Sequence, residues 1–110
     1  MKIEGLSCET VDWDKVPSVE HRGETGTSFW RTIERGAIRL RVVDYSAGFK
    51  TDHWCPRGHV LLVLEGELKV DLRDGRSLCL ETGSGFHAGD DPANPHLVSS
   101  GPGARVYIVD

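Results

Sequence analysis

The 110-residue sequence lacks an excess of positive charge and a long apolar run. It has 13 lysines and arginines against 17 aspartates and glutamates, so its net charge is −4 with histidine neutral. No basic stripe is available for a phosphate backbone, and we therefore expect no nucleic-acid partner. The longest apolar run covers residues 60–64. It is far shorter than a membrane span, so we expect no membrane partner.

A paired set of cysteines is also missing. The three cysteines are an odd number, and their spacing outlines no disulfide framework. Free thiols are typical of reducing compartments. Residues 1–5 contain no apolar stretch of the signal-peptide kind. Together these features predict a cytoplasmic protein.

What the sequence does contain is a series of short alternating segments divided by glycine, proline and aspartate. In residues 37–43 three aliphatic side chains fall on one face, and Arg39 and Arg41 fall on the other, which we expect to be solvated. Further strands are expected at residues 27–33, 59–64, 68–72, 78–80, 86–88, 96–100 and 104–109. This pattern predicts an all-β antiparallel sandwich or barrel.

The strands are expected to form one domain over residues 1–110, with an N-terminal arm and loop at 1–26 and a barrel at 27–110. The arm holds the one expected helical turn, at residues 12–16. Residues 65–67 are expected to form a tight bend, because a glycine lies between two glutamates.

One hairpin allows its register to be predicted. A two-residue turn would pair Val70 with Cys79 and turn Leu78 toward the polar face. A three-residue loop that ends at a left-handed Gly75 would instead pair Val70 with Leu78. The second arrangement keeps the apolar side chains together, so we predict it.

Candidate metal donors are concentrated in residues 51–59. In an extended strand every second side chain points the same way, so His53 and Cys55 would share a face. The Pro-Arg-Gly sequence that follows favours a reversal, and an antiparallel return would bring His59 across from both. Two imidazoles and a thiolate would then converge, which is a typical donor set for a transition metal.

The spacing His53-x-Cys55-x3-His59-x6-Gly66 resembles the first cupin motif, His-x-His-x3-Glu-x6-Gly. Cys55 stands where that motif has its second histidine, and His59 stands where it has glutamate. The second cupin motif resembles residues 85–96, in which the final His96 follows the proline by one residue fewer than in the motif.

A smaller group, the DHCW-motif cupin-fold proteins, resembles the chain more closely and over nearly its whole length. The resemblance rests on Asp52-His53-Trp54-Cys55, Gly58-His59, Leu64-Glu65-Gly66-Glu67-Leu68, Pro95-His96 and Ile108-Val109-Asp110. It implies a single-domain, RmlC-like jelly-roll barrel with a metal inside, and it implies no settled reaction.

The ligands predicted on these grounds are His53, Cys55, His59 and His96. Cys55 is either the fourth ligand or a thiol beside a three-histidine site. A ligating histidine usually donates its other ring N–H to a carboxylate or carbonyl, and Asp52 and Glu65 are the carboxylates we expect behind the ligands. The cofactor is one divalent transition metal, and zinc, iron, nickel, manganese and copper all remain open.

Two functions follow from these alternatives. Open coordination positions would suit a metal-dependent oxygenase or isomerase that acts on a small polar molecule. A closed tetrahedral site would suit a non-catalytic metal-binding or small-ligand-binding module, for sensing or storage. A metal-free barrel is a third interpretation. The sequence presents no general base positioned as in a known reaction, so it identifies no catalytic residue and leaves open whether the protein is an enzyme.

A homodimer is expected as well. The strand at residues 60–64 is apolar on both faces, which is more than one thin barrel needs to bury. A jelly roll also has sheet edges to cover.

Overall fold

The computed structural model describes residues 3–110, and within that range it contains nine β-strands and one short 3-10 helix. The elements are η1 (Trp13–Lys15), β1 (Ser18–Arg22), β2 (Thr27–Arg35), β3 (Ile38–Tyr45), β4 (Phe49–Lys50), β5 (His59–Leu72), β6 (Ser77–Glu81), β7 (Gly85–Ala88), β8 (His96–Ser100) and β9 (Ala104–Val109). No helix in the described part is long and apolar enough to cross a membrane.

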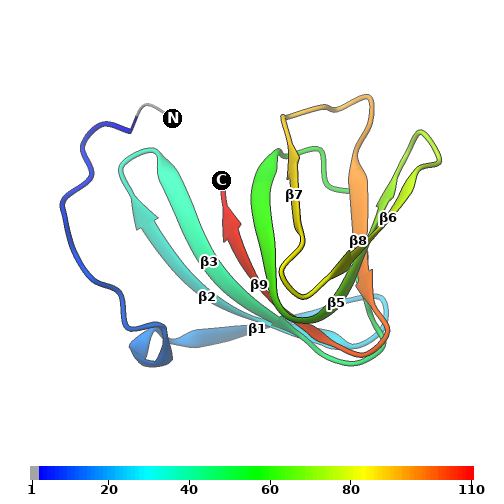
Figure 1. Ribbon diagram of the computed structural model, residues 1–110, viewed down its shortest axis with the longest axis horizontal. Coiled ribbons are helices and arrows are strands. Elements are labelled where there is room, and N and C mark those ends of the chain that lie inside the picture. Colours follow the sequence, from blue (N-terminus) through cyan, green and yellow to red (C-terminus); the bar gives the residue numbers. More distant parts are fainter. Residues whose placement is uncertain (1–2) are drawn as a thin grey trace.

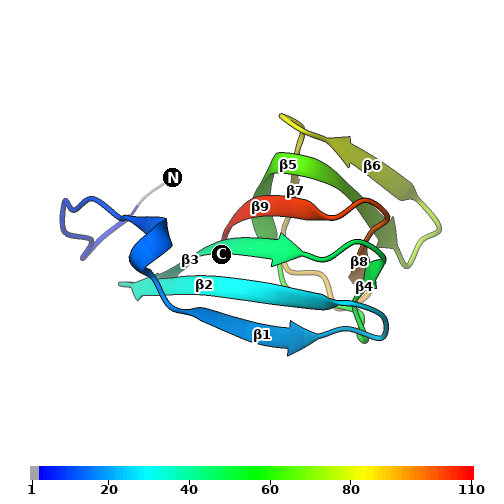
Figure 2. The same ribbon diagram turned by 90° about the horizontal axis from the view of Figure 1, so that it is seen from below.

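All strand pairs are antiparallel, and the sheet curls into an open barrel (Figure 1). Neighbouring strands follow the order β1-β2-β3-β9-β5-β8-β4, and β6 and β7 also pair with β5. Figure 2 shows β1, β2, β3, β9 and β5 side by side as one curved wall. The all-β antiparallel barrel predicted from the alternating segments is confirmed.

Strand β5 joins the two halves of the barrel. Its first half pairs with β7 and β9, and its second half pairs with β6 and β8. A register shift between Val63 and Glu65 marks the change of partners, and Gly66 follows with a φ of 77°. The predicted tight bend at residues 65–67 is therefore wrong. A bulge lets one long strand change direction without leaving the sheet.

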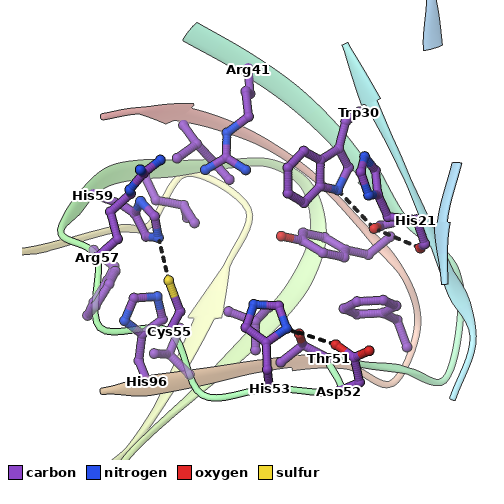
Figure 3. Close-up of a pocket in the computed structure, with 18 of the residues that line it drawn as sticks. His21, Trp30, Arg41, Thr51, Asp52, His53, Cys55, Arg57, His59 and His96 are labelled. Carbon is purple, nitrogen blue, oxygen red and sulfur yellow. Dashed lines mark hydrogen bonds and ion pairs between the residues drawn. The ribbon is translucent and has the colours of Figure 1, made fainter. Parts of the chain in front are cut away.

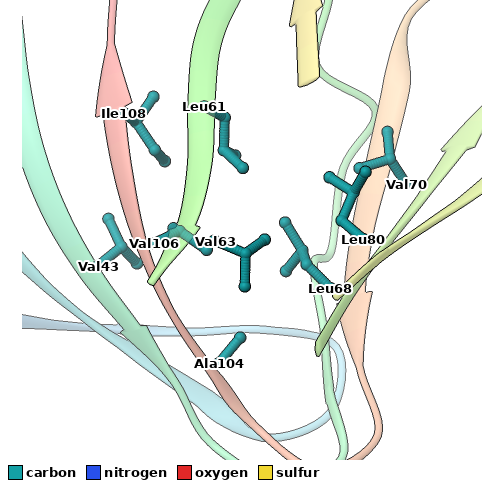
Figure 4. Close-up of a cluster of buried hydrophobic side chains, with 9 residues drawn as sticks. All are labelled: Val43, Leu61, Val63, Leu68, Val70, Leu80, Ala104, Val106 and Ile108. Carbon is teal, nitrogen blue, oxygen red and sulfur yellow. The ribbon is translucent and has the colours of Figure 1, made fainter. Parts of the chain in front are cut away.

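The apolar core fills the closed end of the barrel (Figure 4). It consists of Val43, Leu61, Val63, Leu68, Val70, Leu80, Ala104, Val106 and Ile108. The predicted hairpin register is confirmed, because Val70 pairs with Leu78 and Leu68 pairs with Leu80. Keeping these side chains on one face removes their apolar area from water, and that gain selects the three-residue loop.

The N-terminal part differs from expectation in one respect. The helical turn is present as η1, and the carboxylate of Asp12 accepts a hydrogen bond from the backbone N–H of Asp14. However, residues 18–22 form the edge strand β1 rather than part of a loop. All five β1 residues are exposed, so the strand carries no apolar alternation that could reveal it.

Candidate metal centre and its pocket

A cavity of about 550 Å³ opens above the core. Every strand except β6 contributes to its walls, together with the irregular segment 51–58 (Figure 3). Leu61, Val70 and Ile108 belong both to the core and to the cavity lining, so the cavity begins where the core ends. Trp30, Tyr45, Phe49 and Phe86 add an aromatic surface. Such a cavity can hold a small molecule.

Three possible metal donors meet at this cavity. One ligand atom from each of Cys55, His59 and His96 lies within 4.8 Å of the others. The Cys55 sulfur is 3.8 Å from Nε2 of His59, and the His59 and His96 rings are 5.0 Å apart between centroids. One thiolate and two imidazoles form a chemically suitable set for a divalent transition metal.

The backbone brings Cys55 and His96 together by a route that the sequence interpretation missed. Their peptide groups exchange two hydrogen bonds, of 2.7 and 2.9 Å, in an isolated β-bridge. Residues 51–58 form no regular strand, and His59 pairs with Ala88 rather than across from Cys55. The expected local hairpin is therefore wrong, although His59 and Cys55 do meet. Cys55 is paired with His96, the first residue of β8. His59 is the first residue of β5, and it lies at the same end of the barrel, so Cys55 comes close to it.

Behind His59 lies Asp110, whose side chain is 3% exposed. Its Oδ2 accepts a 2.7 Å hydrogen bond from Nδ1 of His59, which leaves Nε2 free to face the cysteine. The burial of Asp110 acts to raise its pKa, but the hydrogen bond from Arg39 and the charges of Arg41 and Arg39 lower that pKa to about 2. The carboxylate is therefore ionised at neutral pH.

Asp110, rather than Asp52 or Glu65, supports the three-donor group. Glu65 pairs in register with Arg105 and does not line the cavity. A signal for Asp110 was present in the sequence. Val106 and Ile108 are buried, so period-2 alternation along β9 also points position 110 inward.

Both histidines of the group are held in the neutral form that a metal requires. Burial, and then the nearby His59, lowers the pKa of His96 to about 4. Burial lowers the pKa of His59 as well, although the charge and hydrogen bond of Asp110 oppose this. Neutral imidazoles can bind a metal ion without first losing a proton.

His53 lies apart from the three-donor group. Its side chain is exposed and lines the cavity mouth, where Nδ1 is 2.8 Å from Oδ1 of Asp52 (Figure 3). The hydrogen bond with His53 lowers the pKa of Asp52. Asp52 therefore contacts His53 as expected of a carboxylate behind a ligand, while ligation by His53 remains a prediction.

The prediction that Arg39 and Arg41 lie on a solvated face is wrong. Arg41 is 4% exposed, and its guanidinium lies between His59 and Trp30 in Figure 3. Its Nη2 donates a 3.0 Å hydrogen bond to Asp110, while Arg39 donates two, of 2.8 and 2.9 Å, to the same carboxylate. Alternation correctly separated the two faces of β3 but could not tell which face points into the barrel.

Trp54 takes no part in the cavity. Its ring lies outside the lining and contacts the guanidinium of Arg73, whose central carbon is 4.6 Å from the ring centroid. His21 does line the cavity, and its ring stacks on Trp30 with a centroid distance of 4.0 Å.

Comparison with known proteins gives a clear result for the fold. No protein-family model matches the chain, and no curated protein matches it either. Solved structures do match. The polyketide cyclase RemF from Streptomyces resistomycificus has a TM-score of 0.75 at 22% identity, over 94% of this chain and 78% of its own. An RmlC-like cupin from Shewanella frigidimarina has a TM-score of 0.73 at 16% identity, over 96% of this chain and 91% of its own.

A third similar structure is Fe(II)-HppE with the alternative substrate (S)-1-HPP, with a TM-score of 0.72 at 16% identity. The match covers 94% of this chain and 60% of that one, so the chain spans less than two thirds of that protein. These likenesses show that the chain has the cupin fold, which confirms the jelly-roll barrel implied by its motifs. The finer resemblance to the DHCW-motif group remains a prediction.

Proposed function

We propose that this protein binds one divalent transition metal through Cys55, His59 and His96 and acts with it on a small molecule held in the adjacent cavity. The observation that carries the proposal is the convergence of these three donor atoms at the wall of a cavity of about 550 Å³. The hydrogen bond from His59 to buried Asp110 supports it, because a carboxylate behind a ligating imidazole fixes the ring and its tautomer.

Three protein ligands leave coordination positions for a substrate or oxygen. A metal in this place would act as a Lewis acid or redox centre, as an oxygenase or isomerase requires. The chain's own residues would orient the ligand imidazole through Asp110 and shield the bound molecule with the aromatic surface. A thiolate with two imidazoles suits zinc, iron, nickel or copper better than manganese. Among the similar structures, Fe(II)-HppE holds iron together with an alternative substrate, which supports a metal beside a small molecule in this fold.

The second candidate function is a non-catalytic metal or small-ligand module. His53 favours it, because its ring lines the cavity and Asp52 contacts only Nδ1, which leaves Nε2 unengaged by that carboxylate. If this ring moved to join the group, four protein ligands would close the site, and closed sites are typical of structural or sensory metals.

The test is metal content, measured by mass spectrometry on untagged protein, for the wild type and for His96→Ala, Cys55→Ser and His53→Ala. One equivalent that is lost in His96→Ala and Cys55→Ser but kept in His53→Ala supports the three-donor site. Loss in His53→Ala as well supports the closed site. If the wild type takes up no metal from a mixture of divalent ions, the proposal is wrong.

We also infer that the protein is a cytoplasmic, single-domain homodimer. Val60, Leu62 and Leu64 lie on the outer face of β5 and are 52%, 42% and 40% exposed. Three aliphatic side chains in a row on a sheet surface favour contact with another apolar face. All three cysteines are free, which agrees with a reducing compartment.

A further inference from the structure

Arg41 is a buried cation, and some of its N–H donors have no hydrogen-bond acceptor within residues 3–110. The side chain is 5% exposed, yet the guanidinium makes one hydrogen bond within residues 3–110, from Nη2 to Asp110. Its Nε is buried and has no hydrogen-bond partner in that range. Guanidinium carries five N–H donors, so most of its capacity remains available. Arg41 lines the cavity, and an incompletely paired guanidinium at that place suggests a ligand acceptor.

Asp110 does not neutralise Arg41 by itself, because this carboxylate is shared. Its Oδ2 accepts from His59, Arg39 and Arg41 at 2.7, 2.9 and 3.0 Å. Burial, and then the like charge of Arg39, lowers the pKa of Arg41. A second anion beside the guanidinium would offset the cost of burying the positive charge of Arg41. It would also offset the repulsion between Arg41 and Arg39.

The charged side chains that line the cavity are mostly positive, as Arg41 is. The charged residues that line it, apart from the histidines and the cysteine, are four arginines and one aspartate: Arg22, Arg39, Arg41, Arg57 and Asp52. Asp52 already contacts His53. A divalent metal with one thiolate would add further positive charge. The cavity therefore favours an anion over a neutral or cationic molecule.

The position of Arg41 fixes where the anion would lie. Its guanidinium carbon is 4.6 Å from the centroid of the Trp30 ring, which holds the cation against the aromatic surface. Through Asp110 it shares one carboxylate oxygen with His59. A small molecule bound at Arg41 would thus lie between the aromatic surface and the three-donor group (Figure 3).

We propose that the cavity binds a small aromatic or otherwise unsaturated carboxylate, whose carboxylate group pairs with the guanidinium of Arg41. Arginine suits this role because its planar fork matches the geometry of a carboxylate. The flat body of the ligand lies against Trp30 and its aromatic neighbours. The inference deepens the proposed function, on which it rests for the reaction, since the far end of the same molecule would face the metal.

The test uses benzoate as the probe and benzamide as its neutral match, titrated by calorimetry into chelator-treated protein and into metal-loaded protein. We expect benzoate to bind about tenfold more tightly than benzamide, and Arg41→Gln to remove about that advantage, because one charge-assisted hydrogen-bonded contact is lost. The matched control is Arg35→Gln, which removes a cation whose side chain pairs with Glu9 and does not line the cavity. It should leave benzoate affinity unchanged.

A second measurement follows ligand binding in the wild type and needs a variant only to assign one signal. The Nε–H signal of Arg41 in the nitrogen NMR spectrum of the wild type, assigned by its loss in Arg41→Lys, should move as benzoate is added and stay in place with benzamide. If millimolar benzoate leaves this signal unmoved, or binds no better than benzamide, the inference is wrong.

The two proposals can fail separately. If chelator-treated protein binds benzoate through Arg41 but takes up no metal, the carboxylate site stands and the metal-dependent function is wrong. If the protein takes up metal but Arg41→Gln binds benzoate as the wild type does, the metal site stands and the carboxylate inference is wrong.

Discussion

The carboxylate of Asp110 and the imidazole of His59 are joined by a 2.7 Å hydrogen bond across 51 positions of sequence. The bond fixes the proton on Nδ1 and turns Nε2 toward the cysteine. The same carboxylate pairs with two arginines, Arg39 and Arg41, and both line the cavity. Asp110 thus links the proposed metal site to the proposed carboxylate site.

Replacing this carboxylate should weaken metal binding. Asp110→Asn keeps the size of the side chain but removes the charge that orients His59, so we expect metal affinity to fall by about 10- to 100-fold. Competition with a chelating dye measures the change. The matched control is Asp44→Asn, which breaks an ion pair of 2.7 Å with Arg105 outside the cavity and should leave the affinity unchanged. Equal affinities in Asp110→Asn and the wild type would contradict the role assigned to Asp110.

Tyr45 should make stability depend on pH in the alkaline range. Burial raises the pKa of its hydroxyl to about 12, whereas an unfolded tyrosine titrates at about 10. Between these values the folded state keeps a proton that the unfolded state has lost, so the free energy of unfolding falls as pH rises. The contribution is complete below pH 10 and is lost toward pH 12.

Chemical denaturation across this range, compared with Tyr45→Phe, measures the effect. The variant should show a smaller fall in the free energy of unfolding than the wild type. Parallel curves for the two proteins would show that Tyr45 is not protected from ionisation.

The bulge in β5 predicts a strong effect at one glycine. Gly66 has a φ of 77°, and a Cβ there would collide with the carbonyl oxygen of Gly103. Gly75 also has a positive φ, of 98°, but nothing lies within 4 Å of its added Cβ. Gly75→Ala should therefore cost about 1–2 kcal/mol, the usual penalty for a left-handed alanine.

Gly66→Ala should cost clearly more than Gly75→Ala, because the backbone of Gly103 has to move as well. Urea denaturation of both variants measures the difference. Equal losses of stability would mean that β5 can change partners without the close approach seen at Gly66.

The exposed face of β5 gives a prediction about assembly. If Val60, Leu62 and Leu64 pack against a second copy, light scattering at micromolar concentration should give twice the chain mass of 12.1 kDa. Leu62→Glu should reduce it to the mass of one chain, because a buried carboxylate is strongly unfavourable at an apolar contact. The control Val19→Glu changes another exposed aliphatic residue, on β1, and should leave the mass unchanged. A wild type that measures 12.1 kDa would disprove the dimer.

Strand positions could be predicted from the sequence to within a few residues because alternation is a local property. The pairing of Val70 with Leu78 followed from burial alone, since any other register would expose leucines. Strand β1 was missed for the converse reason. An edge strand with five exposed residues has no apolar face, and only its pairing with β2 defines it.

The candidate site was only partly predictable. Cys55 and His59 are four positions apart, so any sharp turn brings them near each other, and motif spacing singled out His96. The sequence could not separate His53 from this group, because that depends on how segment 51–58 bends at the cavity mouth.

Alternation, turn chemistry and motif spacing are local properties, so the sequence alone was enough to predict an antiparallel barrel, its hairpin register and four candidate metal ligands: His53, Cys55, His59 and His96. The contact of Asp110 with His59 and the position of Arg41 in the cavity lining became evident from the folded chain. The Arg41–Asp110 contact spans 69 positions. It exists because β3 and β9 are neighbours in a curled sheet, and the direction of the curl decides which face of β3 is inside.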